Sequence, residues 1–504
     1  MRPKPLRTWW WIVPLVAVSF GAAGREVPLV DAVKAADTAA VRVLLARGVD
    51  ANASEANGTT ALHWAARLDR LDSMDLLISA GANVKAANRY GVTPLSLACA
   101  NGNATIIERL LKAGADPNTA LPGGETALMT TARKGSADAV KVLVAHGADI
   151  NARESTRGQT ALMWAAAQNN VAAIQALLAA GADIHARSAE PEFKSNWVVG
   201  NGAAPLPTEV RIEFTSLLFA VRAGHVEAVE ALLAGGANVN DTAPNGTSAL
   251  LLATINAHWE LAGVLLDKGA DPNAAATGWT ALHQVARNRA PSIGYVPPPV
   301  QTGRLSSLDL VKKLIAHGAN SNARMTKDMV DGYPNRLNRI GATPFLLAAK
   351  GLDIDLMRLL LANGADPLLT NDDKTTPLMA AAGVGIAYQG GDSGTHEDAL
   401  KAVKWLLLEL GSQLETPNRA GETALHGAAR RGANVLVQFL VDRGARLDAR
   451  TKRGLIPIDF ADGRKVESTL RAQPQTVALL RQLMKDRGLP TGAEPINGNK
   501  PSEK

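Results

Sequence analysis

The chain repeats itself along almost its whole length, and this self-similarity constrains the fold more than any other feature. The clearest copies are Thr60-Ala61-Leu62-His63-Trp64-Ala65-Ala66 and Thr160-Ala161-Leu162-Met163-Trp164-Ala165-Ala166. Twelve anchor positions share this register, most of them 32 to 34 residues from the next: 27, 60, 93, 126, 160, 215, 248, 280, 343, 376, 423 and 456. Such a period predicts one small unit stacked many times, rather than several unrelated globular domains.

Each unit is predicted to be a pair of short helices. In the copy that starts at Thr60, the threonine suits the N-cap of a first helix. A second helix is expected over Leu71–Ala80, with Leu77 and Ile78 on its buried face and Gly81 ending it in a left-handed conformation. Neither helix is long enough to be stable alone, so the units must stabilise one another by stacking.

These units resemble ankyrin repeats over residues 27–488. The resemblance rests on the Thr-[Ala/Pro]-Leu-[His] start, the paired alanines, the Leu-Leu pair and the Gly-Ala-[Asp/Asn] turn. It implies a mainly α fold, an α-solenoid of about twelve helix–turn–helix units with projecting β-hairpin tips and four insertions. The resulting division is a signal peptide at 1–24, the repeat solenoid at 25–488 and a disordered tail at 489–504. The usual activity of such a solenoid is to hold another protein.

Composition agrees with a folded chain. Hydrophobic residues make up 46% and charged residues 20%, which excludes a disordered protein. Aromatic residues are only 4%, so the core must consist mainly of Ala, Leu and Val. Cys99 is the one cysteine, so no intramolecular disulfide is possible. The net charge is +6, and +3 without Arg2, Lys4 and Arg7, so no nucleic-acid partner is expected.

The first residues have the three-part layout of a secretory signal. Residues 2–7 are basic, residues 9–20 are apolar, and residues 21–24 are small enough for signal-peptidase cleavage. The apolar stretch is shorter than the about 20 residues that span a bilayer. We therefore predict a secreted or periplasmic protein with no membrane span after cleavage. The alternative is an inner-membrane protein anchored by an uncleaved signal.

Four segments interrupt the period: 188–213, 289–306, 324–341 and 384–397. Three of the four tyrosines of the chain lie in them, together with one tryptophan; these residues are Trp197, Tyr295, Tyr333 and Tyr388. Tyr and Trp are enriched in binding hot spots. We predict that a partner protein docks around the eighth to tenth units, with Trp279 beside it. The alternative is that the insertions are merely tolerated surface loops, because long loops cost little closure entropy.

Basic residues also recur seven positions after the anchors, at Lys34, Arg67, Arg133, Arg222, Arg287, Lys350 and Arg430. By the resemblance, this position faces the concave groove of the solenoid. A positive stripe there would favour an acidic partner surface. The alternative explanation is that a cation near the end of a helix interacts favourably with the helix dipole.

The sequence predicts no catalytic residues, no metal site and no cofactor. His63, His283 and His426 occupy equivalent repeat positions, which indicates helix capping or bonds between repeats rather than metal ligation. Gly391-Asp392-Ser393-Gly394, followed by His396, is only superficially similar to a serine-protease nucleophile segment. We therefore expect a non-catalytic, monomeric protein-binding scaffold of the cell envelope. The alternatives are a membrane-anchored adaptor, or a hydrolase or enzyme subunit whose chemistry lies in the insertions.

Overall fold

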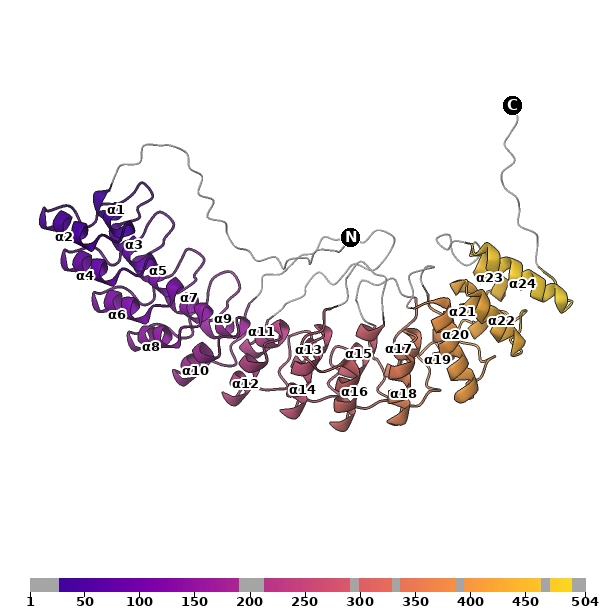
Figure 1. Ribbon diagram of the computed structural model, residues 1–504. Coiled ribbons are helices and arrows are strands. Elements are labelled where there is room, and N and C mark those ends of the chain that lie inside the picture. Colours follow the sequence, from indigo (N-terminus) through magenta and orange to yellow (C-terminus); the bar gives the residue numbers. More distant parts are fainter. Residues whose placement is uncertain are drawn as a thin grey trace, which may run out of the picture. The chain divides into compact units, whose positions relative to one another are not determined.

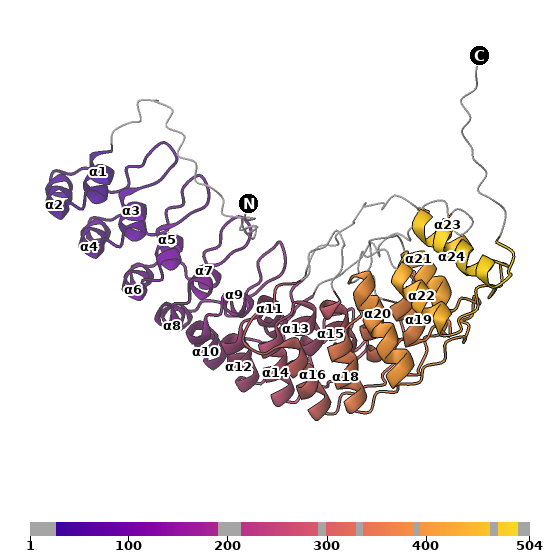
Figure 2. The same cartoon turned by 45° about the vertical axis from the view of Figure 1, so that its right-hand side comes forward.

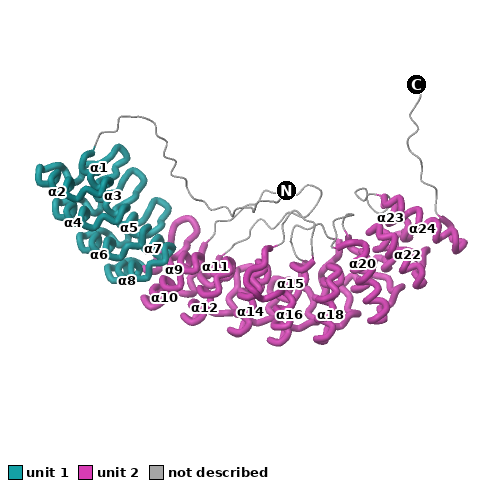
Figure 3. The backbone as a smooth tube through the Cα atoms, in the orientation of Figure 1, with its two compact units in different colours: residues 1–149 teal, residues 150–504 magenta. Residues whose placement is uncertain are grey.

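The computed structural model describes residues 27–189, 213–290, 299–328, 336–386, 394–463 and 472–491. The expected signal peptide, residues 492–504 of the expected tail, and Trp197, Tyr295, Tyr333, Tyr388 and Ser393 lie outside these residues. The chain divides into two compact units, unit 1 up to Asp149 and unit 2 from Ile150 (Figure 3). Each unit is a row of short helix pairs, as the repeat predicts.

The described part of unit 1 contains four helix pairs. Their bounds are α1 Pro28–Lys34, α2 Thr38–Ala46, α3 Ala61–Arg67, α4 Leu71–Ser79, α5 Pro94–Asn101, α6 Ala104–Lys112, α7 Ala127–Lys134 and α8 Ala137–Ala145. The predicted second helix of the Thr60 copy is therefore α4, which ends one residue earlier than expected. Its Leu77 is fully buried, but Met74 takes the other core position and Ile78 is only half-buried.

Unit 2 continues the same alternation. Its helices are α9 Ala161–Ala167, α10 Val171–Ala179, α11 Ser216–Ala223, α12 Val226–Ala234, α13 Ala249–Ile255, α14 Trp259–Asp267, α15 Ala281–Arg289, α16 Ser307–Ala316, α17 Pro344–Lys350, α18 Ile354–Ala362, α19 Pro377–Ala382, α20 His396–Lys404, α21 Ala424–Arg431, α22 Asn434–Asp442, α23 Pro457–Asp462 and α24 Pro474–Asp486. A π-helical turn, η1 Trp405–Glu409, extends α20. The last described helix, α24, ends two residues before the predicted end of the repeat region at residue 488.

All twelve anchor positions lie at the N-cap of an odd-numbered helix. In α3, the Thr60 hydroxyl accepts the His63 N–H, and His63 Nδ1 accepts the Thr60 N–H at 3.1 Å. The even-numbered helices often end at glycine; Gly81, for example, has φ +82° after α4. The Thr and Gly that recur in the repeat therefore mark where its helices begin and end.

Within each unit the odd-numbered helices form one row and the even-numbered helices a second row (Figures 1 and 2). Helices of one row pack on their neighbours in that row, as α3 does on α5 and α6 on α8. Small side chains between the rows, such as Ala65 and Ala98, are fully buried. Leu62 and Leu95 repeat the same buried position in consecutive pairs. The core is thus one aliphatic layer continued from pair to pair, as the low aromatic content predicts.

After several of the even-numbered helices, an asparagine ties one helix pair to the next. Asn322 shows the pattern: its Nδ2 donates to the Gly364 carbonyl at 2.8 Å, and its Oδ1 accepts the Asp366 N–H at 2.7 Å. The same acceptor bond is made by Asn52, Asn118, Asn151, Asn240 and Asn273. These exposed bonds from side chain to backbone join consecutive helix pairs outside the apolar core.

The loops between pairs, here called tips, project from the odd-numbered row, as the loops of unit 1 show in Figure 2. In the described residues, the tips contain isolated antiparallel bridges, such as the one between Ser54 and Thr60. The described tips contain no strand longer than such a bridge. The expected β-hairpins are therefore hairpin-shaped turns. No helix in the described residues is long and apolar enough to cross a membrane.

Candidate functional site

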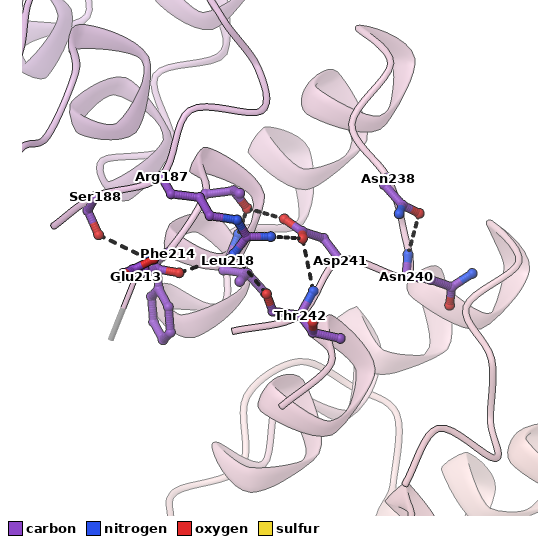
Figure 4. Close-up of polar contacts among 10 residues, drawn as sticks. Arg187, Ser188, Glu213, Phe214, Leu218, Asn238, Asn240, Asp241 and Thr242 are labelled. Carbon is purple, nitrogen blue, oxygen red and sulfur yellow. Dashed lines mark hydrogen bonds and ion pairs between the residues drawn. The ribbon is translucent and has the colours of Figure 1, made fainter. Parts of the chain in front are cut away.

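The insertions leave the repeat from firmly bonded ends. At the first insertion, Ser188 and Phe214 exchange two bonds: Ser188 N–H to the Phe214 carbonyl at 2.9 Å, and Phe214 N–H to Ser188 Oγ at 3.0 Å (Figure 4). Beside them, the Arg187 guanidinium donates to the Thr242 carbonyl at 2.8 Å and to Asp241 at 2.5 Å. These bonds close the base of the insertion against the next tip.

The second insertion, between α15 and α16, starts at an ion pair. Arg289 binds both carboxylate oxygens of Asp353, at 2.6 and 3.0 Å, and also donates to Ser307 Oγ. On its return, Thr302 bonds to the side chain of His258 at 2.8 Å. Arg289 and Asp353 are mostly buried, so this bidentate pair is a structural support of the insertion rather than a free binding group.

The third and fourth insertions meet. Arg336 N–H donates to the Gly385 carbonyl at 3.1 Å, and Leu337 lies so close to Gly385 that a Cβ there would come within 2.7 Å of Leu337. Leu337 is buried. The sequence groups these insertions around one docking region but does not predict this contact between their described ends.

The predicted basic column does not present a uniform positive stripe. In unit 1, Lys34 binds Glu55 at 2.6 Å and both Lys34 and Arg67 lie over the Trp64 ring. Arg133 binds Glu125 at 3.1 Å. Acidic residues on the tips thus neutralise two members of the column.

The column differs along unit 2 as well. Arg222 lies over the rings of Phe214 and Phe219. Arg287 and Lys350 are half-buried. Trp279, the described member of the predicted aromatic site, is also half-buried, and its indole N–H donates to Gln284 at 3.2 Å. These residues therefore contribute to the packing of the odd-numbered row and its tips.

Arg430 is the exception, because it is buried and only partly compensated. Its side chain is 9% exposed, binds Glu422 at 3.2 Å and lies 4.9 Å from the centre of the Phe460 ring. Its Nε has no hydrogen-bond partner among the described residues. Burial lowers the pKa of the Arg430 guanidinium below its ordinary value; Glu422 opposes this shift and the charge of Arg336 adds to it.

Arg430 lies at a cavity of about 510 Å³, here called the tip pocket. Three successive tips, the ends of the third and fourth insertions, and helices α21 and α23 line it. Its charged lining residues are Arg336, Asp373, Arg419, Glu422, Arg430, Lys452 and Arg453. The described part of the lining therefore contains five cations and two carboxylates. The volume is within the roughly 300–1,000 Å³ of typical ligand sites.

The repeat pattern predicts Arg430 as a basic residue of the concave face, but it does not predict the other cations of this pocket. Arg419 and Lys452 both lie four positions before an anchor, on consecutive tips, and only a register that included the tips would have revealed them. Their exposed side chains belong to loops whose repeat pattern is weak, whereas the helix pattern is strong.

Four of the histidines bond to a neighbouring helix pair. His63 Nε2 bonds to the Val92 carbonyl at 3.0 Å and His283 Nε2 to the Ala342 carbonyl at 3.1 Å, each in the following pair. His225 and His258 bond instead to carbonyls of the preceding pair. No group of three or more His, Cys, Asp or Glu side chains in the described residues is arranged to hold a metal ion.

Comparison with protein families gives matches to ankyrin-repeat models. The description "Ankyrin repeats (3 copies)" matches residues 29–121, 119–188 and 214–295; "Ankyrin repeats (many copies)" matches 407–461, and "Ankyrin repeat" matches 340–372. Together these matches cover well over half of the chain.

Parts of several known proteins are similar to this chain. The human mitochondrial disaggregase is 28% identical over 34% of this chain and 25% of that protein. The Caenorhabditis elegans ankyrin repeat and KH domain-containing protein mask-1 is 29% identical over 48% of this chain and 9% of that protein. Human ankyrin repeat and SOCS box protein 16 is 30% identical over 43% of this chain and 47% of that protein. The chain thus spans less than half the length of these relatives.

Among solved structures, the ankyrin repeat domain of human ASB11 matches 49% of this chain and all of that domain, with a TM-score of 0.40 and 24% identity.

Proposed function

Because the chain belongs to the ankyrin repeat family, we propose that it is a non-catalytic scaffold of the cell envelope that binds another protein through its tips and odd-numbered helices. The observation that carries this proposal is the bonding of tip to tip. In unit 2, Asp372 N–H donates to the Ile340 carbonyl, Arg419 N–H to the Asp373 carbonyl and Lys452 N–H to the Ala420 carbonyl. A row of loops held in this way is a preorganised surface, and preorganisation lowers the entropic cost of binding.

The aromatic insertions form part of the proposed surface. Tyr333 and Tyr388 belong to the two insertions whose described ends meet at Arg336 and Gly385. Tyr295 belongs to the insertion that begins after the Arg289–Asp353 pair. The three segments therefore leave the scaffold from supported positions in neighbouring helix pairs, which favours one shared docking region.

Chemical crosslinking in the native envelope, followed by identification of the captured protein, tests the scaffold function. A variant without residues 291–298 keeps Arg289 and Ser307, and hence the contacts that support the stack. We expect this variant to lose most of the captured partner, while removal of residues 192–210 from the first insertion leaves capture largely intact. Failure of the unaltered protein to capture any specific partner would contradict the scaffold function.

Export is tested separately. The basic start, apolar stretch and small-residue end of residues 2–24 support a cleaved signal. N-terminal sequencing of protein recovered from the envelope should give a start near Arg25. An intact N-terminus in the membrane fraction would instead establish the anchored form.

A further inference from the structure

The third insertion is an addition to a tip that is already complete. The base of a regular tip is closed by backbone bonds, as between Asn88 and Val92 before α5. The third insertion has such a base too: Met325 N–H donates to the Ala342 carbonyl at 2.9 Å, and Gly341 N–H to the Met325 carbonyl at 2.7 Å. The residues that this insertion adds are therefore not needed to form the tip.

On its return, the third insertion is held beside α19 by its main chain. We call residues 336–338 the strap. The Arg336 N–H donates to the Gly385 carbonyl at 3.1 Å, in the turn after α19. The Asn338 carbonyl accepts the Asn371 side-chain N–H at 2.5 Å, in the tip before α19. The strap is thus bound at both ends through backbone groups, which any amino-acid sequence can supply.

The middle residue of the strap, Leu337, is the one whose side chain is buried, at 3% exposure. Gly385 has φ +86°, and a Cβ there would come within 2.7–2.8 Å of the N, Cα and Cβ atoms of Leu337. A glycine at this position therefore lets the two backbones approach closely. Val384 and Ile386, on either side of it, are also 3% exposed. We call Asn371 and residues 384–386 the seat.

The strap and the seat cover a face that other helix pairs leave exposed. The position seven residues after the anchor is exposed at Arg67 and Ala100, but it is buried at Gly383 and Arg430. The Arg430 guanidinium also donates to the Ile386 carbonyl at 3.5 Å. In this part of unit 2, the chain therefore occupies surface on which a partner could lie in other helix pairs.

We propose that the seat is a binding site for an extended peptide segment with a leucine side chain. The strap is the internal occupant of this site, and a segment of the partner protein with the same chemistry displaces it. Recognition of extended backbone by main-chain bonds, with one pocket for a side chain, is a common mode of peptide binding. A covalently linked segment has a high effective concentration, so the few bonds of the strap are enough to keep it seated. This inference rests on the proposed scaffold function and specifies the chemistry of the bound segment.

The test begins with a strap-less variant that lacks residues 327–339. It leaves Thr326 and Ile340 between the bonded residues of the base, and the regular tip before α5 also has two residues there. It keeps the bonds to the neighbouring tips, from Thr326 N–H to the Gly278 carbonyl and from Asp372 N–H to the Ile340 carbonyl. The stack should therefore remain folded, which circular dichroism checks. A second variant, Leu337→Asp in the full chain, unseats the strap without changing the length of the insertion.

The probe is a fluorescent peptide with the sequence of residues 334–341, whose binding is followed by anisotropy. The same peptide with Leu337→Asp is the control probe. We expect the unaltered peptide to bind the strap-less variant about tenfold more tightly than it binds the unaltered protein, because the linked strap competes in the latter. The full-length Leu337→Asp protein should likewise bind it more tightly than the unaltered protein, and the control probe should bind all three chains weakly.

Gly385→Ala in the strap-less variant tests the position of the site. The added Cβ lies where the backbone of Leu337 packs, so the affinity for the peptide should fall about tenfold. Gly454→Ala in the same variant is the matched control. Gly454 has φ +76°, which strains alanine in the same way, but no heavy atom lies within 4 Å of the added Cβ. This control should leave the affinity for the peptide unchanged.

Three results would overturn the proposal: equal affinity of the peptide for the unaltered and strap-less chains, equal affinity of the two peptides for the strap-less chain, or no loss of affinity with Gly385→Ala. The assay contains only this chain and a peptide taken from it, so its outcome does not depend on the scaffold function. A failure of that function appears in a different assay, as the absence of any crosslinked partner.

Discussion

At the scale of single residues, a buried histidine links each of several helix starts to the next pair. His283 Nδ1 accepts the Thr280 N–H and its Nε2 donates to the Ala342 carbonyl, so only the neutral ring fits both bonds. Burial lowers the pKa of His283 to about 4. The sequence predicted capping or inter-repeat bonds for this position, and the structure confirms both at once.

This depressed pKa predicts an acid-sensitive fold. Between pH of about 6.5 and about 4, the unfolded chain binds a proton at His283 that the folded chain does not, so the free energy of unfolding falls as pH is lowered through this window. His283→Ser should weaken that fall, measured by urea unfolding at pH 7 and 4.5, although it lowers stability at both. Serine already occupies the equivalent position at Ser96, where it completes the same cap.

His185→Ser provides the control, because His185 is exposed. It should leave the fall in stability between pH 7 and 4.5 as large as in the unaltered protein. An equally steep fall in His283→Ser would show that His283 is not a source of the acid sensitivity.

At the scale of the helix pair, the core positions follow from the register. Leu162 in α9 is 1% exposed, whereas Gln168 at the end of the same helix is exposed. Leu162→Ala should lower the free energy of unfolding by about 2–5 kcal/mol, and Gln168→Ala by less than about 0.5 kcal/mol. Chemical denaturation measures both. Equal losses would contradict the register of the repeat.

The bonds between pairs give a second prediction at this scale. Asn322→Ala removes both bonds to the following pair, at Gly364 and Asp366, and should cost about 1–3 kcal/mol. Asn363→Ala is the matched control, since its side chain bonds only within its own helix end, to the Leu359 carbonyl. Denaturant unfolding should separate the two variants. A larger loss for Asn363→Ala would contradict the assigned role of the Asn322 bonds.

The helix pairs were predictable because local signals agree with the stack. Thr60 caps a helix in any context, Gly81 ends one, and a period of about 33 residues repeats both. The tip pocket was not predictable in the same way. Arg336 reaches it from an insertion with no counterpart in other units, and the contact between Arg336 and Gly385 joins segments that no period relates. Irregular contacts of this kind arise from tertiary packing rather than from local sequence.

At the scale of the whole molecule, each end of a helix stack needs a cover, because the last pair lacks a neighbour. In unit 2, α24 packs on α22 and α23 and buries Leu480 and Met484. A chain that ends after Gly463 should therefore unfold at lower urea concentration and bind more of a hydrophobic dye. A chain that ends after Thr491 keeps α24 and should behave as the full chain; equal midpoints for the two truncations would refute the capping role of α24.

The two bonds between Ser188 and Phe214 have a practical consequence. Because these bonds join the two ends of the first insertion, we expect this position to accept a replacement segment whose own ends lie equally close together. An autonomous domain whose own ends lie close together, such as a fluorescent reporter, could be spliced there. The fluorescence of the reporter would then show where in the cell the protein is, while the helix pairs remain unchanged.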